Sequence, residues 1–218
     1  MLRKDVRVWF SKTGTARYIS HLDLNRCMAR AFHKAKLPLW YTEGFNPHVF
    51  LTFAAPLSLG FEGRHESMDI RLIEEIPYPE LIERLNAGLP RDIRVYAVTE
   101  PEMKGNDVAN AEYVLRVETE DPEALYQALL GVLALPELPV QKHTKKGERT
   151  VDIRPYFANM DFKVSDGCLA MTVRLPAGNQ GGINPTLFLD AAEKELGCAL
   201  YARVERTGLF DNQFRPFR

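Results

Sequence analysis

The feature that most constrains the fold of this 218-residue chain is one order of strands and helices that occurs twice. Apolar residues alternate with period two at 6–10 and then recur at helical spacing over 24–35. The first half continues with predicted strands at 49–53 and 66–73, a helix at 80–89 and a strand at 93–98. Residues 99–110 have no periodicity, which is typical of a linker. The first half therefore predicts the order β-α-β-β-α-β.

The same order follows the linker. The predicted elements are strands at 113–117, near 140–143, within 151–164, at 168–175 and at 199–205, and helices that begin after Asp121-Pro122 and Asn184-Pro185. Pro155 interrupts the stretch 151–164. We therefore predict an α+β protein of two tandem ferredoxin-like domains, residues 1–104 and 111–218. Each would have an antiparallel sheet with helices on one face. The uncovered faces would either pack together or bind a ligand.

The composition is that of a globular protein, with 45% hydrophobic and 26% charged residues. No run of 18 apolar residues and no apolar signal core occur, so we expect a cytoplasmic protein that does not enter a membrane. Cys27, Cys168 and Cys198 are widely spaced and form no C-x-x-C pair. This spacing argues against a disulfide framework, a metal site or an iron–sulfur cluster, and we expect no cofactor.

Basic residues are concentrated at the start of the chain. Residues 1–60 hold nine Lys or Arg against three acidic residues. A second basic segment spans residues 141–155, where Lys146-Gly147 indicates a hairpin tip. Basic surfaces attract polyanions, so RNA is the predicted partner, and scattered solvated charge is the alternative.

Two groups of residues are candidates for contacts. The predicted phosphate contacts are basic: Lys12, Arg17, Arg26, Arg30, Lys142, Lys145, Lys146 and Arg149. The predicted contacts to a base or a partner protein are His21, Tyr41, Glu43, His48 and Asp152. The turn at 41–48 explains Asn46 and Pro47 but does not require Glu43 or His48. Asp152 is expected to pair with Arg149 or Arg154, and a role as ligand or base is the alternative.

Trp9 and Arg7 share the face of the first strand opposite to Val6 and Val8. An aromatic residue beside an arginine on an open sheet face is typical of proteins that stack a single-stranded base. The alternative, which we favour, buries Trp9 between the two domains.

Three motifs resemble one known family. They are Phe10-Ser11-Lys12-Thr13-Gly14, the S-H-L-D sequence at 20–23 and the Y-T-E-G-F-N-P-H sequence at 41–48. The chain resembles the radical-SAM-linked family, a bacterial domain of unknown function, and E-R-T-V-D-I-R-P-Y at 148–156 also fits it. The resemblance implies a radical SAM protein as partner, fused or encoded nearby. The three-cysteine motif of such an enzyme is absent from this sequence.

These observations support three functions. The first is an RNA-binding accessory protein that presents RNA to a radical SAM enzyme. The second is an RNA-modifying enzyme, since the doubled fold and R-T-V-D ending at Asp152 are similar to pseudouridine synthases, with Asp152 or His48 as the reactive group. The third is an adaptor that binds only protein.

Overall fold

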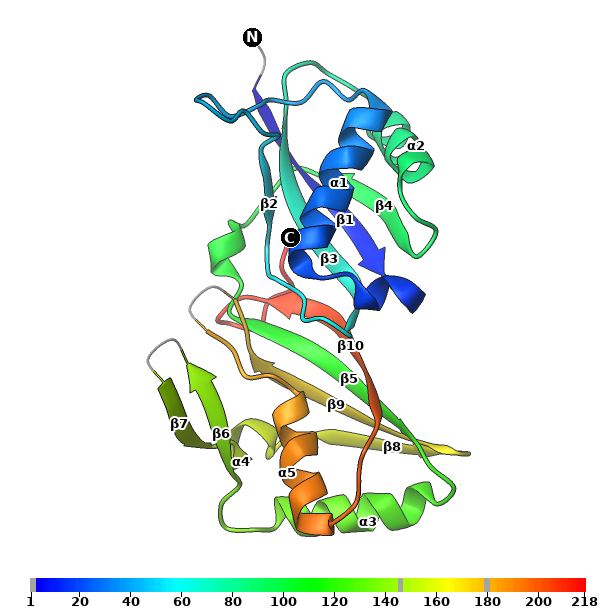
Figure 1. Ribbon diagram of the computed structural model, residues 1–218, viewed down its shortest axis with the longest axis vertical. Helices are drawn as coiled ribbons and strands as arrows, with labels where there is room; N and C mark the ends of the chain where they lie inside the picture. Colours follow the sequence, from blue (N-terminus) through cyan, green and yellow to red (C-terminus); the bar gives the residue numbers. More distant parts are fainter. Residues whose placement is uncertain (1–2, 145–146, 179–180) are drawn as a thin grey trace.

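The computed structural model describes residues 3–144, 147–178 and 181–218, with the main chain alone at 142–144 and 148. Within these residues the protein has a mixed α+β fold, with a mostly antiparallel sheet and five α-helices (Figure 1). No helix of the described chain is long and apolar enough to cross a membrane.

The first half follows the predicted order of elements. It contains β1 (Lys4–Lys12), the 3-10 helix η1 (Gly14–Tyr18), α1 (His21–Ala35), β2 (Leu51–Phe53), β3 (Glu62–Leu72), α2 (Tyr78–Gly88) and β4 (Ile93–Thr99). Val6, Val8 and Phe10 of β1 are completely buried in one apolar cluster with α1 and α2, as their alternation predicts. Helix α1 begins where the Ser20 hydroxyl accepts a hydrogen bond from the Asp23 amide at 3.1 Å. The strands are antiparallel in the order β4-β1-β3-β2.

The second half has the strand order β10-β5-β9-β8, also antiparallel. Its elements are the 3-10 helix η2 (Gly105–Asp107), β5 (Asn110–Glu118), α3 (Pro122–Leu133), β6 (Pro139–Thr144), β7 (Gly147–Asp152), α4 (Arg154–Phe157), β8 (Asp161–Ser165), β9 (Cys168–Pro176), α5 (Thr186–Leu196) and β10 (Ala202–Phe210). Strands β6 and β7 form a separate hairpin. The predicted interruption of 151–164 at Pro155 is confirmed, because β7 ends at Asp152 and Pro155 lies in the first turn of α4, where its missing N–H costs no hydrogen bond.

The two halves share one sheet. Its eight strands include seven in the order β4-β1-β3-β10-β5-β9-β8, with β2 beside β3. The halves meet where β3 and β10 run parallel, with Glu62 opposite Glu205 and Gly63 opposite Arg206. The expected pair of separate sheets is therefore wrong, and the uncovered faces do not pack on each other.

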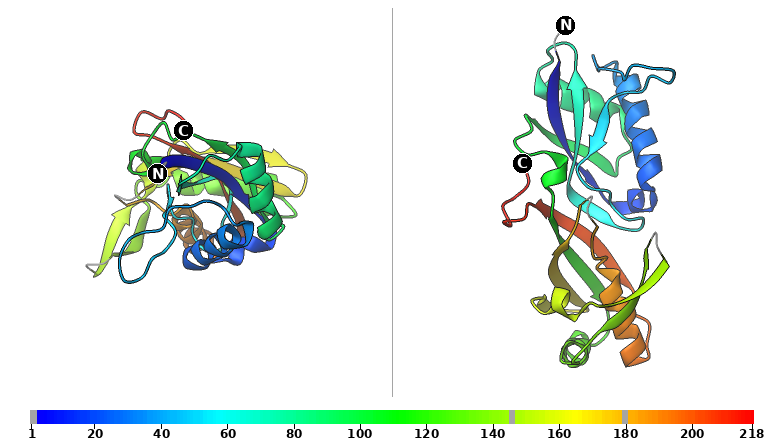
Figure 2. Two further views of the ribbon diagram at one scale, coloured as in Figure 1. Left: turned by 90° about the horizontal axis from the view of Figure 1, so that it is seen from above. Right: turned by 90° about the vertical axis from the view of Figure 1, so that its left-hand side faces the viewer.

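The large helices lie on one face of this sheet. Figure 2 shows α1 and α5 projecting to the same side, and the apolar clusters place α2 and α3 against the same face of their halves. Among the described residues, the opposite face is contacted by the linker at Met103, by the C-terminal residues 211–218 and, at one edge, by α4 (Figure 2). The fold therefore leaves one side of a long sheet open across both halves.

Candidate nucleic-acid interface

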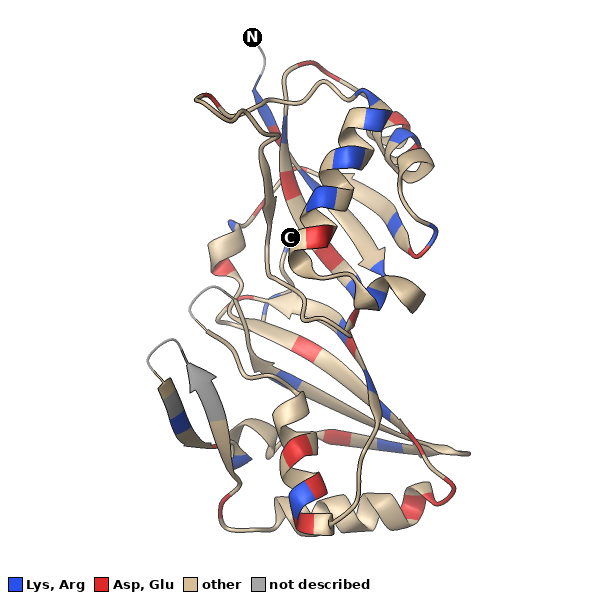
Figure 3. Cartoon of the chain, viewed as in Figure 1, with Lys and Arg blue, Asp and Glu red and all other residues tan. Residues whose placement is uncertain are grey.

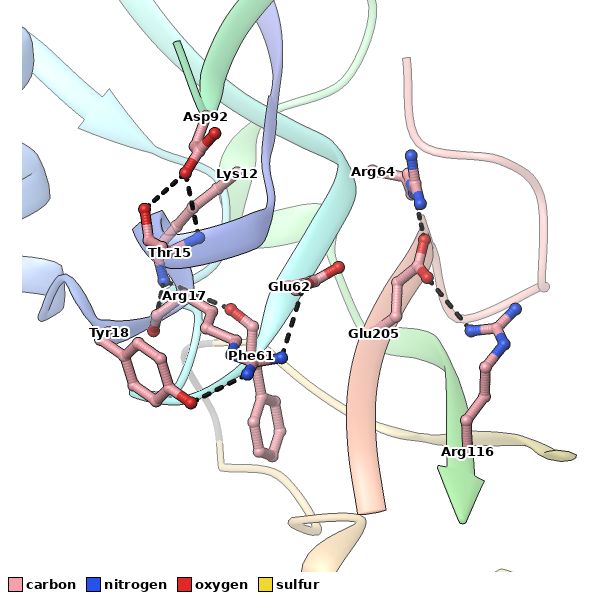
Figure 4. A network of polar contacts seen from close by, with 10 residues as sticks. All are labelled: Lys12, Thr15, Arg17, Tyr18, Phe61, Glu62, Arg64, Asp92, Arg116 and Glu205. Carbon is pink, nitrogen blue, oxygen red and sulfur yellow. Dashed lines mark hydrogen bonds and ion pairs between the residues drawn. The ribbon is translucent and has the colours of Figure 1, made fainter. Parts of the chain in front are cut away.

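Lys12 lies in the interior. Its side chain is 1% exposed, and its ammonium group donates hydrogen bonds to the carbonyl oxygens of Arg17 and Phe61, both at 3.3 Å (Figure 4). Burial lowers the pKa of the Lys12 amine below its usual value. An enclosed ammonium group cannot reach a phosphate, so the prediction of a phosphate contact does not fit this placement. Lys12 instead ties η1 to the chain before β3.

The other predicted basic residues of the first half lie at the surface, but two are paired. Arg17 lies 3.7 Å from Glu62, and its guanidinium stacks 4.8 Å from the Tyr18 ring centre (Figure 4). Arg26 forms an ion pair with Asp23 at 3.1 Å. Arg30 is exposed, and no carboxylate of the described chain forms an ion pair with it. Figure 3 shows the basic residues along α1. The basic start of the chain thus contributes a short stripe on one helix.

The predicted hairpin is present, since Thr144 pairs with Gly147 across β6 and β7. Arg149 on β7 is exposed. Lys145, Lys146 and the side chain of Lys142 lie outside the described residues.

The segment 41–48 forms a loop braced by its own polar groups. The Thr42 amide donates to the His48 carbonyl at 2.8 Å, and His48 Nδ1 lies 3.1 Å from the Asn46 carbonyl. Tyr41 is 48% exposed, and Glu43 lies 3.8 Å from Arg3. His48 therefore serves the geometry of the loop, while Tyr41 and Glu43 face solvent.

His21 lies at the other end of α1 from this loop. Its ring packs 5.0 Å from the Phe53 ring. Burial, with the positive charges of Arg206 and Lys12, lowers the pKa of His21. The structure does not bring His21 together with Tyr41 and His48, since they lie at opposite ends of α1, a helix about 21 Å long.

Asp152 holds the base of the hairpin. Its Oδ1 accepts hydrogen bonds from the amides of Leu138 at 2.8 Å and Arg154 at 3.1 Å. The predicted partners were the side chains of Arg149 or Arg154, whereas the observed partners are backbone groups. This carboxylate closes the connection from β7 to α4.

One buried ion pair joins the halves and was not predicted. Glu66 on β3 and Arg206 on β10 have side chains 4% and 3% exposed, and two hydrogen bonds of 2.5 and 3.0 Å join them. Arg206 also donates to the Pro56 carbonyl at 2.9 Å. Gly63 leaves room for the pair, because a Cβ at this position would collide with the Glu66 carboxylate.

The open face carries a row of basic residues. Arg203 on β10 lies directly opposite Arg116 on β5. The row continues through Ala170 on β9 to Lys163 on β8, because paired residues point to the same side of a sheet. All three basic residues are exposed. Exposed positive charge thus crosses four adjacent strands.

Two further arginines, Arg64 on β3 and Arg174 on β9, lie on the same face as this row. Arg64 on β3 and Arg116 both contact the carboxylate of Glu205, Arg116 at 3.2 Å (Figure 4). The guanidinium-bearing side chains are 57% and 46% exposed, whereas Glu205 is 12% exposed. Arg174 pairs in the same way with Glu112, which is 24% exposed. The carboxylates lie deeper than the arginines they hold, so the exposed layer is basic.

Acidic side chains also lie on this face. Glu118 on β5 and Asp161 on β8 are exposed two residues from Arg116 and Lys163, respectively. They limit the net charge of the face but leave the row itself free of exposed carboxylates.

The sequence contains a signal for the row. Arg116 lies between Leu115 and Val117, and Arg203 precedes Val204, so alternation puts both arginines opposite the core. Ligand binding at an uncovered sheet face was one of the two expectations, but these arginines were not predicted as site residues, because their pairing depends on strand neighbours that alternation does not specify.

Among the described residues, no group of three or more His, Cys, Asp or Glu side chains is placed to hold a metal ion. No curated protein matches the chain. The chain is similar to a solved structure of a Cbf5-Nop10-Gar1 complex, with 13% identity, a TM-score of 0.46, and coverage of 94% of this chain and 48% of that one. The chain thus spans about half the length of that protein. A crystal structure of an unknown protein from Galdieria sulphuraria has 12% identity, a TM-score of 0.27 and coverage of 94% and 99%.

The family comparison is specific, because residues 5–185 match the model of an uncharacterized protein conserved in bacteria, DUF2344. The matched range includes the motifs at 10–14, 20–23 and 41–48 and most of both halves of the sheet. The chain therefore belongs to the DUF2344 family of bacterial proteins.

Proposed function

We propose that the protein binds RNA through the open face of its sheet. The row Arg203, Arg116 and Lys163 carries this proposal, together with Arg64 beside it. RNA binding was predicted from the basic start of the chain, the basic segment 141–155 and the implied partner, but the geometry favours a different surface. Six of the nine basic residues in 1–60 are buried or paired with carboxylates.

The row has a physical reason to accept an anion. Residues directly opposite on antiparallel strands have Cβ atoms about 5 Å apart, and like charges there are destabilising. Arg203 and Arg116 occupy such a pair. A phosphate between them relieves this repulsion, and the row spans about 14 Å across four strands. Phosphate contacts of this kind supply most sequence-independent affinity for nucleic acids.

A binding titration tests the proposal. Fluorescence anisotropy of a labelled single-stranded RNA would be measured with the wild type and with Arg116→Ala/Arg203→Ala at several salt concentrations. We expect the variant to bind at least about tenfold more weakly. Its log–log salt slope should be shallower by roughly 0.7 for each phosphate that the variant no longer neutralises.

A charge-matched variant on the other face separates the two surfaces. Arg30→Ala/Lys34→Ala removes two positive charges from α1, the helix on which basic residues were predicted to contact RNA. We expect a smaller loss of affinity than for the open-face variant. A larger loss would move the interface to α1, and no binding of bulk tRNA or rRNA at low salt would reject RNA binding itself.

The finer fold assignment is part of the proposal. Each half has the strand order of a ferredoxin-like unit, β4-β1-β3-β2 in the first and β10-β5-β9-β8 in the second. The hairpin β6–β7 is then an insertion in the second unit. The two strand orders support two tandem ferredoxin-like units, with boundaries near 1–104 and 111–218.

We retain a radical SAM protein as the proposed partner, on the motif resemblance. The exposed side chains of Tyr41, Glu43 and Phe45 on the braced loop are available for such a contact. Purification from the host in high salt after RNase treatment tests it, since a direct protein contact should persist. Dissociation of the partner under these conditions would contradict a direct contact.

A further inference from the structure

An aromatic slot lies on the open face beside the basic residues. Its volume is about 420 Å³, within the range of small-molecule sites. Its walls include Trp9 on β1, His65 on β3, Tyr96 on β4, and Phe210 and Phe217 near the C-terminus. The slot therefore forms where the first half of the sheet meets β10 and the chain after it.

Three strand irregularities meet at this slot. Tyr96 is an extra residue of β4, because Trp9 pairs with Ala97 and Phe10 with Val95. On β3, Arg64 and His65 together face the single residue Ser11. On β10, Thr207 is extra, since Arg206 pairs with Tyr113 and Gly208 with Glu112.

Extra residues of this kind turn side chains out of the regular alternation. Each of the three irregularities supplies a residue to the slot: Tyr96, His65 and Thr207. Packing of the core does not require three strands to lose register at one place. Their coincidence indicates that the slot is a built feature of the sheet.

The polar groups of the slot are held in place. Trp9 Nε1 donates to the Thr99 hydroxyl at 3.0 Å, and the Tyr96 hydroxyl lies 2.8 Å from His65 Nδ1. Burial and the charge of Glu66 raise the pKa of Tyr96 to about 12, so its hydroxyl is protonated at neutral pH. Tyr96 remains 45% exposed. The rings are fixed, and aromatic surface remains open to a ligand.

Positive charge lies next to the slot. Arg64 adjoins the lining residue His65, and Glu205 lies two residues from the lining residue Thr207. Arg64 and Arg116 share the one carboxylate of Glu205, so this group keeps a net positive charge. An apolar aromatic slot beside two arginines fits a ligand with a flat ring and a phosphate.

We propose that the slot holds one unpaired nucleobase of the bound RNA, with the adjoining phosphate on Arg64 and Arg116. This proposal rests on the RNA-binding function and names its substrate class. A paired base is stacked within a duplex and cannot enter the slot. The protein therefore selects single-stranded RNA over duplex of the same sequence.

Tryptophan fluorescence tests the proposal directly. The chain has two tryptophans, so the full-length Trp40→Phe variant leaves Trp9 as the reporter. We expect AMP, UMP and a single-stranded oligonucleotide to quench Trp9 saturably, and ribose 5-phosphate, which lacks a base, to have no effect. Ala97→Leu should abolish quenching by filling the slot. Tyr96→Ala should weaken oligonucleotide binding roughly 5- to 160-fold, the range for one stacked base.

The outcomes separate the slot from the RNA-binding function. Equal quenching by ribose 5-phosphate, no quenching by any nucleotide, or equal affinity for duplex and single strand overturns the slot proposal. RNA binding that is unchanged in Ala97→Leu and Tyr96→Ala leaves the RNA function standing without the slot. Quenching by AMP without RNA binding identifies a free-nucleotide site and rejects the RNA function. Thermal unfolding of each variant confirms that it is folded.

Discussion

At the scale of single residues, the buried pair Glu66–Arg206 is the contact whose removal should matter most. Glu66→Gln leaves the Arg206 guanidinium buried, with 3% of the side chain exposed, without its counter-charge. Removing one partner of a buried ion pair costs about 3–5 kcal/mol. We expect the free energy of unfolding in urea to fall by about this amount.

The matched control removes a carboxylate from an exposed pair. Glu80 lies 3.1 Å from Arg84 on α2, with side chains 50% and 33% exposed. Glu80→Gln should cost less than about 1 kcal/mol. If the two substitutions lowered the free energy of unfolding equally, burial would not determine how much the Glu66–Arg206 pair stabilises the protein.

His21 should make stability depend on pH. Burial and the charges of Arg206 and Lys12 lower the pKa of His21 in the folded protein. Below about pH 6.5, the ordinary value for histidine, the unfolded chain binds a proton that the folded chain takes up only at lower pH. The free energy of unfolding should therefore decrease as the pH falls through this window. In urea titrations between pH 7 and 5, the free energy of unfolding of His21→Gln should change less with pH than that of the wild type. An equal change in both proteins would show that other groups cause the pH dependence.

The sequence predicted residue types better than residue environments. Lys12 has the composition of a phosphate contact, but the fold encloses it under Arg17 and Phe61. Arg116 and Arg203 were predictable as outward-facing residues, because alternation fixes the side of a strand. That they lie directly opposite each other was not predictable, because this depends on which strands become neighbours.

At the scale of elements, the hairpin β6–β7 depends on Asp152. Asp152→Ala leaves the amide of buried Leu138 without its acceptor, which costs about 1–3 kcal/mol. Asp152→Asn keeps an acceptor oxygen and should retain most of the stability. Hydrogen exchange at the Leu138 amide is the measurement, and exposed Glu137→Ala is the neighbouring control.

The same pair of variants addresses the enzyme hypothesis. If Asp152 were a general base, Asn and Ala would both abolish modification of cellular RNA, whatever their effects on stability. A structural cap predicts a difference between the two, with only Ala destabilising the hairpin. Disappearance of an RNA modification in Asp152→Asn would contradict a purely structural role.

The predicted ends of two strands were wrong, because pairing with neighbouring strands extends them beyond the local sequence pattern. Strand β3 begins at Glu62, four residues before the predicted start, because its first residues pair with β10. Strand β10 extends to Phe210 because Gly208 to Phe210 pair with β5 beyond the irregularity at Thr207. Both extensions depend on pairing between distant segments, which a single strand pattern does not contain.

At the scale of the whole molecule, the sequence did not predict how the two halves of the sheet are joined. The order β-α-β-β-α-β correctly indicated the elements of the first half. In the second half the hairpin β6–β7 was predicted from the strand near 140–143 and from Lys146-Gly147, whereas α4 was not predicted. It left open whether the uncovered sheet faces would pack together or bind a ligand, and it did not predict a shared edge. The shared edge consists of two residue pairs between β3 and β10, too few to produce a periodic signal. This joint creates the continuous open face on which the proposed RNA surface depends.

The halves are tied on both sides of the sheet, which predicts cooperative unfolding. Glu66 and Arg206 join them on the helix side. On the open side, Arg7 is completely buried and donates to the carbonyl oxygens of Met103 and Arg218, at 2.7 and 2.5 Å, while Phe217 packs 4.2 Å above its guanidinium. Trp9 was expected to be buried between the two domains. The buried residue on this face is instead Arg7, and the C-terminal residues cover it.

Calorimetry tests this coupling. Because neither half can open without breaking these ties, the wild type should unfold in a single transition with equal calorimetric and van't Hoff enthalpies. Glu66→Gln combined with Phe217→Ala weakens the ties on both sides and should resolve two transitions, one for each apolar cluster. Two transitions in the wild type would show that the halves unfold independently. The open face would then be a surface between two separately stable units, and the RNA-binding surface would come apart before global unfolding.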